Sequence, residues 1–179
     1  ILSVLGGSDV CIRDRAAVVR AWAFYRRYGR DLEKMSEHAV LNANYLRHRI
    51  LNPTSEQAEQ IPAMPVDGAP AEVVKHEFTL GLSPVKEATG VTGKDVAKRL
   101  LDHGYMAPTL YFPQIVPDCL MIEPTETESK EVLDDFAAAF LTVLGEDPDI
   151  VKSAPHTTPV GRVDEVWAAR NLVLRYHSD

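Results

Sequence analysis

The chain has 179 residues, enough for one domain with a core of its own, and 45% of them are apolar. Its formal net charge of −7 argues against a nucleic-acid-binding protein, which normally presents a basic face. No apolar run approaches the ~20 residues of a membrane-spanning helix. Two cysteines without CxxC spacing, Cys11 and Cys119, favour a reducing cytoplasm over a disulfide framework.

The N-terminal part predicts a lead-in followed by two helices. Residues 1–15 show neither a strand nor a helix period, and we expect them to be an unmatched or non-native lead-in. Residues 16–51 predict a helical pair that links this chain to a domain outside it. The first helix carries an apolar face formed by Val18, Trp22 and Tyr25. Because the turn between the helices is short, we expect them to pack antiparallel.

The rest of the chain predicts an irregular connection (52–72), a small α+β domain (73–145) and a C-terminal arm (146–179). The connection is rich in proline, and the arm has a weak helix near 164–170. The domain is expected to begin with a half-buried strand over 74–80 and a helical turn near 85–89, followed by a helix capped by Thr92 and ended by Gly104. Two strands are then expected, over 109–112 and 119–123. The last helix is expected to begin with a Thr125–Glu128 capping box, to carry Val132 and Phe136 in its apolar stripe and to end at Gly145. Together these elements predict an antiparallel sheet with helices on one face.

Two polar residues fall on apolar faces of these elements. His76 shares a strand face with Phe78, which fits either a core histidine bonded to a backbone carbonyl or a residue that lines a ligand pocket. Asn42 interrupts the stripe of the second helix, where it either fixes the helix register or contacts a ligand. The sequence leaves both alternatives open.

Two further segments hold candidate site residues. Pro108 stiffens the backbone beside Thr109, which suits either a loop that presents a hydroxyl or a rigid crossover. Glu126 and Glu128 suit a helix N-terminus, whereas Glu123, at a strand end, has no local structural role. The sequence contains no GxSxG, Walker A or GxGxxG motif and no spacing that indicates a metal site.

Long contiguous stretches resemble a known family. They are SEHAVLNANYLRHRI, KHEFTLGL, TGVTGKDVAKRLLDHGYMAPTLYFP, LMIEPTETESKEVLDDF and APHTTPVGRVDEVWAAR. They resemble the C-terminal part of glycine dehydrogenase (decarboxylating), the P-protein of the glycine cleavage system. The resemblance covers roughly 16–176 and is greatest to the second subunit of the split bacterial form.

The resemblance implies the small domain of a fold type I, aspartate-aminotransferase-like enzyme that uses pyridoxal 5′-phosphate. It implies decarboxylation of glycine and transfer of the aminomethyl group to the lipoyl arm of H-protein, with a first P-protein subunit or half as partner, in the bacterial cytoplasm. The lysine that binds the cofactor lies upstream in this family, so no catalytic residue is expected here and the chain alone is expected to be inactive. Residues expected to line or support the site are Asn42, His76, Pro108, Thr109, Glu123 and Glu126. The element order also permits a non-enzymatic, ferredoxin-like module that binds an amino acid.

Overall fold

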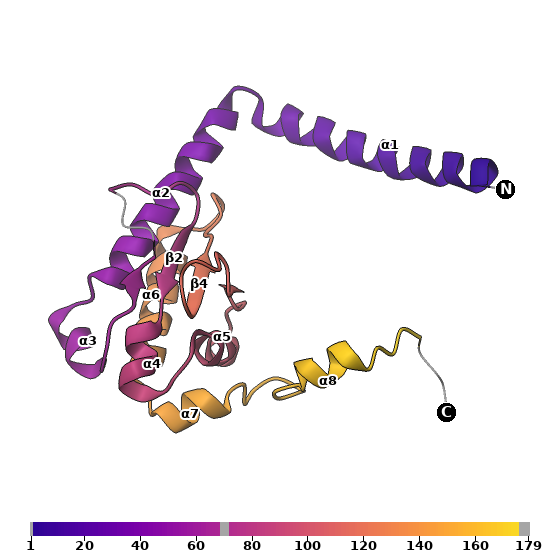
Figure 1. Cartoon of the computed structure of the whole chain (residues 1–179). Coiled ribbons are helices and arrows are strands. Elements are labelled where there is room, and N and C mark those ends of the chain that lie inside the picture. The colour runs from indigo at the N-terminus through magenta and orange to yellow at the C-terminus, as the bar shows by residue number, and fades with distance from the viewer. Residues whose placement is uncertain (1, 69–71, 176–179) are drawn as a thin grey trace.

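The computed structural model describes residues 2–68 and 72–175 (Figure 1). Its elements are α1 (Leu2–Tyr28), the 3-10 helix η1 (Gly29–Asp31), α2 (Leu32–Leu51), α3 (Ser55–Gln60), β1 (Val66–Asp67), β2 (Phe78–Gly81), α4 (Ser83–Thr89), α5 (Gly93–Asp102), β3 (Thr109–Leu110), β4 (Cys119–Ile122), α6 (Lys130–Gly145), α7 (Pro148–Ser153) and α8 (Glu165–Arg170). None of the helices in these ranges is long and apolar enough to cross a membrane.

A four-stranded antiparallel sheet organises the body, with strand order β1-β2-β4-β3. In its centre Leu80 pairs with Leu120, and Phe78 pairs with Ile122. These four side chains are buried in one cluster with side chains of α2, α4, α5 and α6. The prediction of a mixed helix and antiparallel-sheet fold is therefore confirmed.

The strand around His76 differs from the prediction. β2 begins only at Phe78, and all four of its residues are buried, so it is not half-buried. His76 lies in a bend before the strand, where its side chain is exposed. The placement of His76 on an apolar strand face is therefore wrong, because the apolar alternation continues past the point where pairing with β4 stops.

The helices that pack on the sheet follow their apolar patterns in part. Leu46 and Ile50 of α2 are fully buried, as their stripe predicts. In α6 the buried side chains include Leu133 and Phe140, whereas Val132 is 42% exposed, so the predicted stripe is wrong by one residue at the start of the helix.

The start of α6 corrects a second prediction. The helix is capped by Ser129, whose side chain accepts a hydrogen bond from the backbone N–H of Val132. Thr125 and Glu128 do not form a capping box, and Glu126 and Glu128 lie in the loop before the helix. By contrast, Thr92 caps α5 as predicted.

The predicted antiparallel pair is not formed. α1 projects away from the body while α2 packs against α6 (Figure 1). The turn at η1 contains Gly29 with a φ of 51°, a left-handed conformation that glycine adopts without a steric penalty. Residues 2–15 belong to the same helix as 16–28, which the absence of a period in 1–15 did not predict.

Three short elements were not predicted. α3 and β1 fall in the connection expected to be irregular, and α7 falls in the arm. α7 belongs to the body, since Val151 is buried in the core cluster. Beyond α7 the arm carries α8 close to where the weak helix was predicted.

Candidate functional site

The loop over 123–128 brings most of the predicted site residues together. The side-chain amide of Asn42 donates to the backbone oxygen of Thr125 at 2.8 Å and to that of Glu128 at 3.2 Å. The NH₂ group of this half-buried asparagine is therefore paired with two carbonyls, which offsets the cost of a polar residue in the α2 stripe. Asn42 thus fixes the loop that carries Glu123 and Glu126.

On one side of this loop lies a pocket of about 450 Å³, here called the Thr109 pocket. Its lining includes Tyr105, Pro108, Thr109, Glu123, Val132 and Phe136. Tyr105 packs edge-on against Phe136, with ring centroids 5.1 Å apart, and this contact fixes one wall. Most of the lining is apolar, with the hydroxyl of Thr109 and the carboxylate of Glu123 among its polar groups.

On the other side lies a pocket of about 420 Å³, the His76 pocket. Its lining includes Met35, Val40, His76, Glu123, Thr125 and Glu126. His76 Nε2 lies 3.8 Å from a carboxylate oxygen of Glu123 and 4.0 Å from one of Glu77. Glu123 lines both pockets, so it forms part of the wall between them.

Thus all six predicted residues lie around one loop: Pro108 and Thr109 on one side, His76 on the other, Asn42 beneath it, and Glu123 and Glu126 within it. The sequence did not indicate that Tyr105 and Thr125 belong to the same region. In the described ranges, His76, Glu77 and Glu123 also form a group whose donor atoms all lie within 4.8 Å of one another. The three side chains are exposed or half-exposed, and exposed acidic groups often lie together without an ion.

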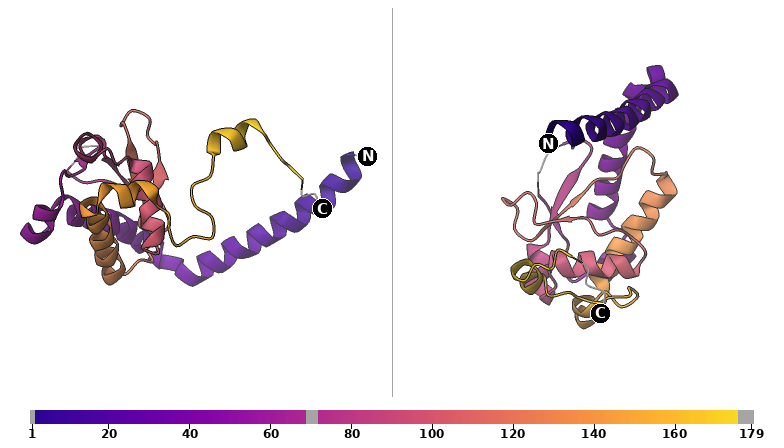
Figure 2. Two further views of the ribbon diagram at one scale, coloured as in Figure 1. Left: turned by 90° about the horizontal axis from the view of Figure 1, so that it is seen from below. Right: turned by 90° about the vertical axis from the view of Figure 1, so that its right-hand side faces the viewer.

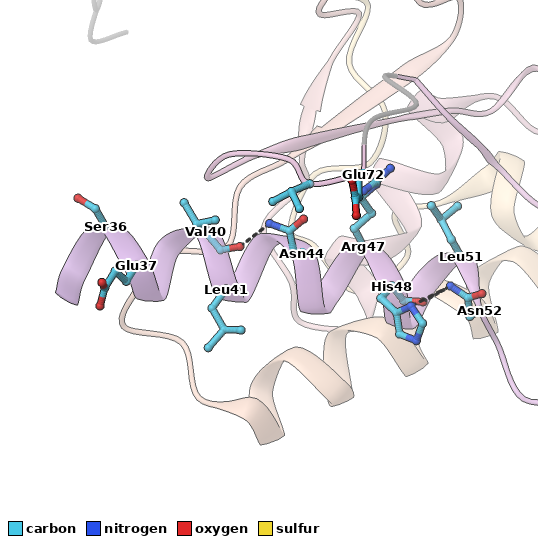
Figure 3. Close-up of a pocket in the computed structure, with 11 residues that line it drawn as sticks. Ser36, Glu37, Val40, Leu41, Asn44, Arg47, His48, Leu51, Asn52 and Glu72 are labelled. Carbon is cyan, nitrogen blue, oxygen red and sulfur yellow. Dashed lines mark hydrogen bonds between the residues drawn. The ribbon is translucent and has the colours of Figure 1, made fainter. Parts of the chain in front are cut away.

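A third hollow, of about 890 Å³, runs along α2 and is called the α2 groove (Figure 3). Two of its polar side chains, Asn44 and Arg47, are bonded within the chain. Asn44 donates to the carbonyls of Val40 and Val74 and accepts from the N–H of Val74, and Arg47 is paired with Asp67. The groove therefore offers mainly apolar surface rather than reactive groups.

A cluster of charges between α5 and the arm escaped the sequence analysis. Its members are Arg99, Asp102, His103, Glu146 and His156. One oxygen of Asp102 accepts from the N–H groups of His156 and Thr157 at 2.7 and 2.8 Å, and from the Thr157 hydroxyl at 2.9 Å. Burial alone would raise the pKa of Asp102, but these bonds and Arg99 lower that pKa to about 2. The carboxylate therefore ties the arm to α5.

Within this cluster three groups follow the order of a Ser–His–Asp triad. Ser153 Oγ lies 3.1 Å from His156 Nε2, and His156 Nδ1 lies 3.5 Å from the carboxylate of Asp102. The guanidinium of Arg99, which can only donate, lies 3.3 Å from His156 Nδ1, so we assign the ring proton to Nε2. Ser153 Oγ itself lies 2.7 Å from the carbonyl oxygen of Asp149 and donates to it. Nε2 then has no lone pair for a serine proton, and the cluster is structural.

Cys119 gives no nucleophile either. The side chain is buried, its sulfur lies 3.6 Å from the carbonyl oxygen of Pro113, and burial raises the pKa of the thiol. A thiol with a raised pKa is protonated at neutral pH and reacts slowly.

Comparison with known proteins then decides the family. The family model described as the glycine dehydrogenase C-terminal domain matches residues 35–159. The chain belongs to this family. All six predicted site residues lie within the matched range.

Curated relatives match nearly the whole chain. Proteins named probable glycine dehydrogenase (decarboxylating) subunit 2 are 44% identical over 176 residues in Thiobacillus denitrificans, 48% over 176 in Nitrosospira multiformis and 43% over 177 in Coxiella burnetii. The matches cover 96%, 96% and 97% of this chain but 34%, 33% and 34% of those proteins. The chain thus spans about a third of the length of these relatives. The resemblance to the second subunit of a split P-protein is confirmed, and the alternative regulatory module is not favoured.

Proposed function

We propose that this chain is the C-terminal third of a glycine dehydrogenase (decarboxylating) subunit with the fold of type I pyridoxal-phosphate enzymes. The whole enzyme decarboxylates glycine and passes the aminomethyl group to the lipoyl arm of H-protein, in the bacterial cytoplasm and together with a first P-protein subunit. The observation that carries the proposal is the identity of 43% to 48% to relatives of that name over nearly all of this chain.

Four of the seven lysines, Lys34, Lys75, Lys94 and Lys130, have surroundings that do not suit a cofactor anchor. A lysine that reacts with the aldehyde of pyridoxal phosphate needs a lowered pKa, from burial or from a neighbouring cation. Hydrogen bonds to carboxylates instead raise the pKa of Lys34, Lys94 and Lys130. Lys75 lines the His76 pocket but is exposed to solvent. We therefore propose that the anchoring lysine lies in the part of the polypeptide that precedes this chain.

When bound, pyridoxal phosphate supplies the electron sink for the loss of CO₂, and the protein supplies orientation and a site shielded from water. We assign this second task to the loop over 123–128 and to the Thr109 pocket. Its mainly apolar lining, with the polar groups of Thr109 and Glu123 on its wall, suits an elongated apolar group with a polar end, such as a lipoyl arm. His76 and Glu126 border the same loop from the His76 pocket.

Each residue of this wall has a distinct positioning task in the proposal. Pro108 restricts the backbone before Thr109, so that the hydroxyl is presented in one direction. Asn42 fixes the loop through two backbone carbonyls. Glu123, which lines both pockets and lies near His76, carries a negative charge at the dividing wall.

The test is Thr109→Ala in the full-length enzyme, with transfer of the aminomethyl group to lipoylated H-protein as the readout. Loss of one hydrogen bond of about 0.5–1.5 kcal/mol is expected to slow transfer by about 2- to 12-fold. Thr142→Ala is the matched control, because Thr142 is exposed on α6 and does not line the Thr109 pocket. Unchanged transfer kinetics in Thr109→Ala would contradict the assignment of this pocket.

A further inference from the structure

Two arms leave the body of the molecule and carry unburied apolar side chains. In α1, Val18, Trp22 and Tyr25 share one face, and Trp22 is 64% exposed. In α8, Val166 and Trp167 are exposed, the tryptophan by 59%. Figure 2 shows that both arms extend toward the same side of the body. Exposed apolar surface of this extent indicates an interface.

The composition of the first arm supports this inference. Residues 15–30 hold one tryptophan, one phenylalanine, two tyrosines and five arginines, with no lysine, aspartate or glutamate. Protein interfaces are enriched in aromatic residues and arginine and depleted in lysine and acids, whereas solvent-facing helices show the reverse. Arg26 lies over the ring of Trp22, 5.9 Å from its centroid, so charge and aromatic surface are presented together.

The expected stability of α1 also indicates that another surface covers it. None of its side chains between 15 and 27 is buried against the body. A helix without tertiary contacts is only marginally stable in water, because most helical stability in proteins comes from packing of an apolar face. The face formed by Val18, Trp22 and Tyr25 is therefore unsatisfied until another surface covers it.

We propose that α1 and α8 form one docking surface for the rest of the subunit, namely the two thirds of the relatives' length that lies outside the stretch matched here. The matching family model is described as a C-terminal domain, and this chain covers 34% of the Thiobacillus denitrificans protein. In this proposal the part of the subunit that comes before the C-terminal domain is joined to it through α1, which gives that part a high effective concentration at the face around Trp22. The proposal concerns domain assembly and does not depend on the reaction.

The start of the arm that bears α8 is held in place by polar contacts to α5 and to Ala154. Arg162 bonds to the carboxylate of Asp95 at 2.6 Å and to the carbonyl of Ala154 at 2.7 Å. Lys94 of α5 pairs with Glu165 of α8 at 2.8 Å. These contacts hold the start of α8 on α5, while Trp167 remains exposed, as one preformed half of an interface requires.

The two tryptophans give a direct experiment, since they are the only two in the chain and lie one on each arm. The chain is labelled with 5-fluorotryptophan, and its two ¹⁹F resonances are assigned with Trp22→Phe and Trp167→Phe. In the isolated chain both are expected to show the full solvent isotope shift between H₂O and D₂O. The same measurement is then made on a chimera in which this chain replaces the matching third of the Thiobacillus denitrificans protein.

In the chimera both resonances are expected to lose most of their solvent isotope shift. A folded chimera in which either tryptophan stays exposed overturns the proposal. A chimera that fails to fold, under conditions in which the unaltered relative folds, also overturns the proposal. The docking surface of this chain should pack against the rest of the relative's subunit. Loss of the shift in the isolated chain on concentration, or on addition of phosphatidylglycerol vesicles, would make a second copy or a membrane surface the occupant and would also overturn it.

A substitution tests whether the contact holds the arm. Trp167→Ala in the chimera is expected to raise the rate of proteolytic cleavage within 157–164 by about 30-fold, the effect of removing a tryptophan hot spot. Ile115→Ala is the matched control, since Ile115 is 86% exposed on a different loop, and its cleavage rate is expected to stay unchanged. Equal rates in both variants would show that α8 is not docked through Trp167.

Discussion

Asp102→Asn is expected to destabilise the chain by about 2–3 kcal/mol at pH 7. The side chain is 2% exposed and its folded-state pKa is about 2, against about 3.9 for an unfolded aspartate, a difference of about 2.5 kcal/mol in favour of the ionised folded state. An amide places its NH₂ group against the donors of either Arg99 or the 156–157 backbone, so part of the hydrogen bonding is lost as well.

The pH dependence separates this mechanism from simple loss of packing. Because the folded pKa is lowered, the stabilisation is fully present above about pH 5 and is lost as the pH falls toward 2, with about half remaining near pH 3. Urea unfolding of the parent chain and of Asp102→Asn at several pH values should therefore give curves that converge on acidification. Asp135→Asn, at an exposed position, serves as the control. A stability difference that stays constant from pH 7 to about pH 3 would refute the ionic account.

Three further predictions concern the loop, the core and the cofactor. Asn42→Ala removes two hydrogen bonds and should cost about 1–3 kcal/mol and speed amide hydrogen exchange across 123–128; unchanged exchange there would mean that the loop is held by something else. Phe140→Ala should cost about 3–5 kcal/mol in urea unfolding, whereas Val132→Ala should cost about 0.5 kcal/mol, and similar losses would contradict the burial of α6. Borohydride treatment of the isolated chain with pyridoxal phosphate should trap no stoichiometric adduct at a single lysine, and mass spectrometry of such an adduct would place the anchor here instead.

Helix caps, helix ends and short strands were predicted best, because residues close together in the sequence determine them. The cap at Thr92 is confirmed, and its partner in the capping box is Asp95, three residues on. The helical turn predicted near 85–89 forms as α4, and it ends at Gly90, whose φ of 73° would strain a side chain. Of the strands expected over 109–112 and 119–123, the first forms only over Thr109–Leu110 and the second over Cys119–Ile122, and they pair as β3 and β4.

The misplaced start of α6 has a tertiary cause. Thr125 and Ser129 are both acceptable caps by residue type, so the sequence offers two starts. The carbonyls of Thr125 and Glu128 are held by Asn42, 83 and 86 residues away, and this bonding stabilises an extended loop up to Ser129. A contact between residues so far apart in the chain produces no pattern in the local sequence. For the same reason, the sequence could indicate the six candidate site residues but not how they lie relative to one another.

The position of α1 has a different cause. A short turn brings two helices together only if each offers an apolar face to the other. α2 uses Leu46 and Ile50 against the core, and the apolar face around Trp22 finds no counterpart in the described chain. The turn between α1 and α2 is short, as predicted, but α2 is not the surface against which α1 packs.

The first arm, α1, and the candidate site are connected through α2. This helix continues from α1 at one end and carries Asn42, which holds the loop over 123–128, along its length. A domain that docks on α1 is therefore expected to fix the position of α2, the helix whose Asn42 holds the loop over 123–128. Because Glu123 of that loop lines both pockets, the direction of α1 sets where the Thr109 pocket faces relative to the docked body. The proposed site is thus expected to be complete only when the face around Trp22 is covered, which couples assembly of the subunit to the chemistry assigned to it.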